Sequence, residues 1–69
     1  MGLTWDDTGD IAISLMEAHP GVNPLEVRFT DLHRWVTEIA AFADDPKASN
    51  EAKLEAIQMA WLEEYEDSQ

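Results

Sequence analysis

The sequence predicts a small, mostly α-helical domain of three helices. Three stretches carry apolar residues at spacings of three, four and seven, which place those residues on one face of a helix. Each stretch follows a polar residue of the kind that caps helix N-termini. The chain has 69 residues and no cysteine, so one hydrophobic core must hold the fold without disulfides. We therefore expect a single domain over residues 1–69, with residues 66–69 as a frayed polar tail.

The first helix is expected to begin at Thr4, whose hydroxyl can cap the first turn while Asp7 reaches back to it. Gly9 lies within this segment and costs about 1 kcal/mol relative to alanine. The helix should end just before Pro20, because the residue that precedes a proline disfavours helical conformation. The apolar stripe of this helix consists of Ile11, Ala12, Leu15, Met16 and Ala18.

Two further helices follow after a short extended link. Asn23 and Pro24 are typical of the cap and first position of a single helical turn, and residues 27–29 should be extended. Thr30 is expected to cap the second helix, and Ser49 or Asn50 the third, after a loop over residues 42–50. The inward-facing residues are Leu32, Trp35, Val36 and Ile39 in the second helix and Leu54, Ile57, Trp61, Leu62 and Tyr65 in the third. The aromatic residues expected to knit the core are Trp5, Phe29, Trp35, Phe42 and Trp61.

The composition is strongly acidic. Fifteen Asp and Glu residues stand against four Lys and Arg, which gives a formal net charge of −11. This balance repels nucleic acids and anionic membranes and favours cations and basic protein surfaces. The chain opens without the pattern of an export signal, and no apolar run approaches the roughly 20 residues that cross a bilayer. We expect a cytoplasmic monomer. A role of the charge in solubility alone stays open.

Acidic residues of the first helix form the candidate metal site, namely Asp6, Asp7, Asp10 and Glu17. On a helix that begins at Thr4, the three aspartates would share the opening turns, with the glutamate further along the same side. Carboxylate oxygens suit iron, magnesium, calcium and manganese, and two or three of them with water would bind a metal weakly and exchangeably. The alternative is a solvated face that is stabilised by the helix dipole.

A second set of charged residues forms the candidate partner-binding surface, namely Asp31, Arg34, Glu38, Asp44, Asp45 and Glu51. The first three line one face of the second helix, either as a contact strip for a basic partner or as a salt-bridged stripe that contributes little. His33 is expected to have a structural role. The sequence contains no cysteine, no paired nucleophile and base and no glycine-rich phosphate loop, so we expect a protein that is not an enzyme.

Two strings carry a resemblance to a known family. They are Phe29-Thr30-Asp31-Leu32-His33-x-Trp35 and Asp44-Asp45-Pro46…Ser49-Asn50-Glu51, and the likeness runs from Met1-Gly2-Leu3 to Trp61-Leu62-Glu63-Glu64. With these strings the chain resembles the IscX (YfhJ) family of bacterial iron–sulfur cluster assembly. The resemblance implies a winged-helix-like arrangement, binding to a cysteine desulfurase of the IscS type, iron bound through acidic surface residues, and modulation of cluster assembly in competition or company with frataxin.

The residues that match the acidic positions of the family are Asp7, Asp31, Asp44, Asp45 and Glu51. Some family members carry extra acidic residues around Phe42, where this chain has alanines at positions 40, 41 and 43. This departure moves the predicted iron site to the first helix. Two other functions stay open, a stand-alone iron carrier and a DNA mimic that blocks a nucleic-acid-binding protein.

Overall fold

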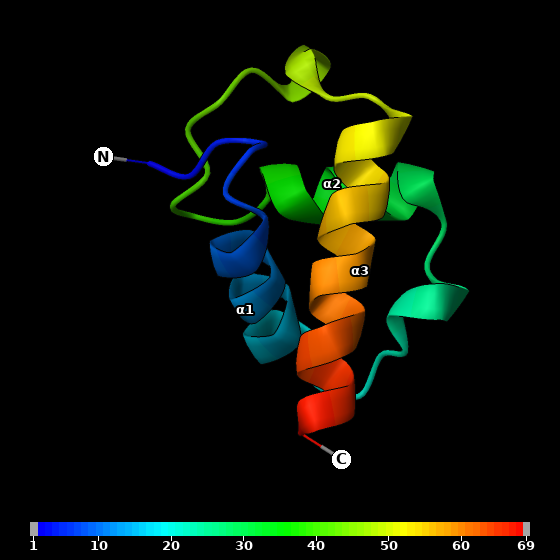
Figure 1. The fold of residues 1–69 in the computed structure, drawn as a ribbon. Coiled ribbons are helices and arrows are strands. Elements are labelled where there is room, and N and C mark those ends of the chain that lie inside the picture. The colour runs from blue at the N-terminus through cyan, green and yellow to red at the C-terminus, as the bar shows by residue number, and fades with distance from the viewer. Residues whose placement is uncertain (1, 69) are drawn as a thin grey trace.

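The computed structural model describes residues 2–68 and consists of helices joined by short links (Figure 1). The elements are α1 (Thr8–Ala18), the 3-10 turn η1 (Pro24–Glu26), α2 (Phe29–Thr37), the 3-10 turn η2 (Pro46–Ala48) and α3 (Glu51–Asp67). α1 and α3 pack side by side, α2 crosses the N-terminal half of α3, and η1 lies against α3 on the side away from α1. The prediction of a mostly α domain with three helices is confirmed.

Residues 2–68 contain no strand, and their β-type pairing consists of one isolated parallel bridge between Leu3 and Phe42. The winged-helix-like arrangement therefore stays a prediction. Among the same residues, no helix has both the length and the apolar character that crossing a membrane requires.

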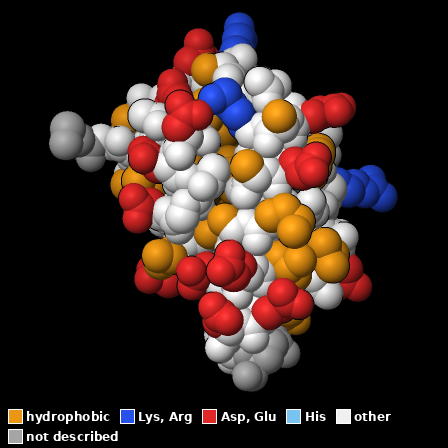
Figure 2. All heavy atoms as spheres, viewed as in Figure 1, with side chains coloured by type: hydrophobic (Ala, Val, Ile, Leu, Met, Phe, Trp, Pro, Cys, Tyr) orange, Lys and Arg blue, Asp and Glu red, His pale blue; other side chains and the backbone are white. Residues whose placement is uncertain are grey.

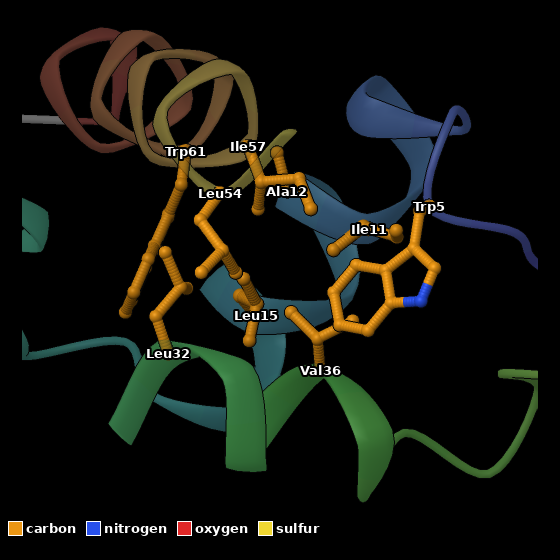
Figure 3. Packing of buried hydrophobic residues seen from close by; sticks show 9 residues of the cluster. All are labelled: Trp5, Ile11, Ala12, Leu15, Leu32, Val36, Leu54, Ile57 and Trp61. Atoms are coloured by element: carbon orange, nitrogen blue, oxygen red, sulfur yellow. The ribbon is translucent and has the colours of Figure 1, made fainter. Parts of the chain in front are cut away.

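The core lies where the three helices meet (Figure 3). Its buried side chains are Trp5, Ile11, Ala12, Leu15, Leu32, Val36, Leu54, Ile57 and Trp61. Burying a large apolar side chain contributes about 1.5–3 kcal/mol, so a few such residues decide whether a domain of this size folds. The prediction of aromatic core residues is confirmed for Trp5 and Trp61, which are fully buried. Phe29, Trp35 and Phe42 are partly buried and cover the edge of the core.

Two helices begin at other residues than the sequence predicts. α1 begins at Thr8, four residues after the predicted start. The predicted contact of Asp7 back to Thr4 is present, since the carboxylate of Asp7 accepts a hydrogen bond from the backbone N–H of Thr4 over 2.8 Å. This pair closes a turn that precedes the helix. α2 begins at Phe29, and Thr30 is not its cap. Because Phe29 packs against the core, tertiary packing sets the start of this helix in place of a capping side chain.

The caps that the sequence predicts for the other elements are confirmed. The side chain of Asn23 accepts a hydrogen bond from the backbone of Leu25 at the start of η1. Asn50 accepts one from Lys53 over 2.9 Å at the start of α3. α3 continues to Asp67 and so includes the first two residues of the expected tail, while Gln69 lies outside the described residues.

Candidate functional site

The N-terminal segment is fastened to the loop that follows α2. The backbone N–H of Leu3 donates to the carbonyl of Ala41 over 2.7 Å, and that of Ala43 donates to the carbonyl of Leu3 over 2.9 Å. Gly2 allows this close approach, since a Cβ atom built at its position would lie 2.1 Å from the Cβ of Ala43. The indole Nε1–H of Trp5 donates to the carbonyl of Asp45 over 2.7 Å. Residues about 40 positions apart therefore form one unit.

Two of the predicted partner-binding acids belong to this unit. Asp44 accepts hydrogen bonds from the backbone N–H of Trp5 over 3.2 Å and from that of Asp45 over 2.8 Å. Asp45 accepts one from the backbone of Lys47 over 2.9 Å, which caps η2. Both carboxylates therefore organise the loop, and a role in partner binding stays a prediction for them.

His33 joins the two strings that carry the family resemblance. Its ring stacks on Trp5 with the ring centroids 5.2 Å apart, and its Nε2 atom forms a hydrogen bond with the carbonyl of Pro46. Phe42 packs edge-on against the same tryptophan, with a centroid distance of 4.8 Å. The histidine thus holds α2 to the loop and to the N-terminal segment, in keeping with the structural role expected for it.

The predicted strip on α2 consists of Asp31, Arg34 and Glu38, and two of these residues form an ion pair with each other. Arg34 lies 3.4 Å from the carboxylate of Asp31, and the two side chains are 61% and 42% exposed to solvent. Exposed pairs of this kind contribute little to stability. Glu38 follows the last residue of α2 and Glu51 is the first residue of α3, and both are exposed. These residues are open to a partner, but their binding role stays a prediction.

The four residues of the predicted metal site do not share one helical face. Asp6 lies before α1 and forms a salt bridge of 2.7 Å with Lys53 of α3, while Asp7 is engaged with Thr4. Asp10 and Glu17 lie on α1 and are exposed. Nowhere in residues 2–68 do three or more His, Cys, Asp or Glu side chains stand where they could hold a metal ion. The expected helical spacing was wrong because the helix begins at Thr8, and iron binding stays a prediction.

The distribution of charge along the chain is a signal that our sequence interpretation missed. Residues 1–27 and 54–69 each contain five acidic residues and no Lys or Arg. Residues 28–53 contain five acidic residues together with all four basic ones. The first two segments supply α1, η1 and all of α3 from Leu54 onward, so these elements carry almost the whole net charge. In Figure 2, acidic side chains are spread over both halves of the view, whereas the visible Lys and Arg side chains all lie in its upper half, away from the lower ends of α1 and α3.

An open groove of about 360 Å³ separates the N-terminal turns of α2 and α3. Its walls are mostly apolar, and they consist of Phe29, Thr30, His33, Glu51 and Leu54. The groove offers a single carboxylate beside an imidazole that is already engaged with Pro46. Its side chains therefore suggest a binding surface and do not form a nucleophile–base pair.

These features describe a small acidic helical protein. The chain belongs to the iron–sulphur cluster assembly family, whose sequence model matches residues 3–66. This match confirms the resemblance to the IscX (YfhJ) family. The chain is also 55% identical over 64 residues to the uncharacterized protein PA3808 of Pseudomonas aeruginosa, and the alignment covers 93% of this chain and 97% of that protein.

Proposed function

We propose that this protein is a non-enzymatic accessory factor of iron–sulfur cluster assembly that binds a cysteine desulfurase of the IscS type and modulates cluster formation. Membership of the family supports the process. The separation of charge along the chain supports a basic partner most directly. Residues 1–27 and 54–69 contain ten acidic residues and no Lys or Arg. Such a surface attracts a basic protein patch and speeds the encounter with it.

The proposed mechanism is electrostatic docking on a basic patch beside the desulfurase active site. A protein bound there can tune the release of sulfur, and it competes with frataxin if both proteins use the same patch. The exposed acidic residues need no rearrangement to serve in this contact, because they extend from helices that are held by the core. The acids in the segment of α2 lie among all the bases of the chain, so we place the main contact on α1 and α3.

The test of this proposal is a titration of the desulfurase by calorimetry over a range of salt concentrations. Attraction between exposed charges is screened over about 10 Å at 0.1 M salt, so we expect the dissociation constant to rise steeply with salt. A desulfurase that fails to bind at low salt would refute the proposed function. Tight binding to DNA-binding proteins in its place would favour the DNA-mimic alternative.

Iron binding is a second part of the proposal, in which exposed carboxylates carry iron as loosely held cargo. Carboxylates are suitable hard ligands, and the salt bridge between Asp6 and Lys53 would compete with any metal at that position. We expect replacement of Asp6, Asp7 and Asp10 by Asn to reduce iron uptake, measured by titration with ferrous iron under anaerobic conditions. Unchanged uptake would show that the first helix is not where iron binds.

A further inference from the structure

An exposed apolar patch lies on the side of α3 that faces away from α1. Leu25 of η1 and Met59 of α3 are large hydrophobic residues whose exposed fractions are 61% and 53%. Single exposed apolar residues are ordinary on protein surfaces, but contiguous patches with a polar rim mark interaction sites. The two residues therefore indicate an interaction site only if they lie in one contiguous patch.

One hydrogen bond holds η1, which contains Leu25, beside the turn of α3 that contains Met59. The side-chain amide of Gln58 donates to the carbonyl of Pro24 over 2.9 Å, which fixes η1 against this face of α3. The half-buried Leu62 is four residues after Gln58 and three after Met59, so it neighbours both on the helix surface. Figure 2 shows a group of hydrophobic side chains right of centre, beside the middle of α3 where η1 approaches it. We call Leu25, Met59 and Leu62 the η1–α3 patch.

The rim of the η1–α3 patch is acidic on both of its elements. Its exposed acidic residues are Glu26 of η1 and Glu55, Glu63 and Glu66 of α3. The three residues of η1 and the whole of residues 54–69 contain no Lys or Arg. A second copy of this chain would bring the same acidic rim against itself, and like charges juxtaposed in an interface disfavour association. The rim therefore selects a basic partner.

We propose that the η1–α3 patch is a docking surface for a protein segment that presents bulky apolar side chains flanked by Lys or Arg. The apolar centre supplies contact energy and the acidic rim supplies orientation, as in other interfaces with a hydrophobic core and a polar rim. The assignment of this partner segment to the cysteine desulfurase rests on the proposed function. The patch itself rests on the geometry of η1 and α3.

The variant that tests this inference replaces Leu25 and Met59 together by Ser. Both side chains are exposed, so the fold should be retained, which circular dichroism and thermal melting check. Ala48 of η2 is exposed and lies outside both α1 and α3, so Ala48→Ser supplies the control at a surface where no contact is proposed. We expect the double variant to bind the desulfurase about tenfold more weakly at every salt concentration, as for loss of an apolar hot spot, and the control to bind like the wild type. Equal affinity of the double variant and the wild type would overturn the inference.

A second probe separates failure of the patch from failure of the proposed function. The probe is a synthetic amphipathic helical peptide with a Leu face flanked by Lys, and its control has Ser in place of Leu. Amide NMR spectra of the labelled protein should show shifts centred on residues 25, 59 and 62 with the Leu peptide, and the double variant should lose them. If the desulfurase does not bind, the proposed function fails. The NMR measurement still shows whether the η1–α3 patch is a docking surface. Shifts that are the same with both peptides, or that centre on α1, would refute the docking surface.

Discussion

The segment of residues 28–53 differs from the pair of helices α1 and α3 in its net charge and in the contacts of its polar side chains. The central segment is nearly neutral, and several of its polar side chains are engaged in internal contacts, such as those of His33 with Pro46 and of Asp31 with Arg34. The paired helices carry acidic residues in excess and direct them to solvent. The comparison teaches that the strings by which the family is recognised chiefly build the fold, whereas the charge that would attract a partner lies elsewhere.

The largest expected effect comes from breaking the central unit at Trp5. The change Trp5→Ala removes a buried ring, its stacking on His33 and its hydrogen bond to Asp45. Replacement of a buried aromatic residue by alanine costs about 3–5 kcal/mol, which is a large part of the stability of a small domain. Urea denaturation followed by circular dichroism measures this loss. The control Trp5→Phe keeps most of the apolar surface and should cost less, and a small loss for alanine would show that the unit is not needed for folding.

Two charge reversals test the comparison of surfaces directly. Glu63→Lys with Glu66→Lys on α3 and Asp31→Lys with Glu38→Lys at α2 change the net charge by the same amount, so their long-range effects should be similar. We expect the α3 variant to weaken desulfurase binding by about tenfold or more. The α2 variant should have a smaller effect, because Asp31 is already paired with Arg34.

Calorimetric titration of both variants at the same salt concentration decides between the surfaces. If the α2 variant alone abolishes binding, the strip predicted from the sequence is the contact and our assignment to α1 and α3 is wrong. Equal losses would mean that only total charge matters to the partner.

The smallest expected effects concern the helix caps. Asn50→Ala removes the side-chain acceptor at the start of α3 and should destabilise the protein by about 1 kcal/mol. Thr30→Ala should cost less, because α2 begins at Phe29 without a capping side chain. Thermal unfolding compares the two variants. A larger loss for Thr30→Ala would support the start of α2 that the sequence predicts.

The helices were predictable because apolar spacing reports on one element at a time. The caps at Asn23 and Asn50 were predictable for the same reason, since each bonds to a residue two or three positions away. The start of α1 was not, because Thr4 and Asp7 can form either a cap or a separate turn. The contacts that favour the turn join Leu3 and Trp5 to residues 41–45, and no local pattern encodes such a distant contact.

The sequence indicated which acidic residues are candidates for the site, but it did not indicate how they are arranged in space. The pairing of Asp6 with Lys53 joins residues 47 positions apart, so the engagement of this predicted metal ligand by a lysine could not be inferred from spacing. The η1–α3 patch depends in the same way on the hydrogen bond between Gln58 and Pro24. The separation of charge, by contrast, needed only a count of basic residues along the sequence.

The hydrogen bond between Trp5 and Asp45 also has a consequence for the order in which the chain folds. The helices consist of local contacts and form within microseconds, whereas this bond closes a loop of about 40 residues at an entropic cost that grows with loop length. Docking of the N-terminal segment is therefore expected to come late. Because that step buries an indole ring, stopped-flow fluorescence of a variant that keeps only this tryptophan would follow it separately from helix formation.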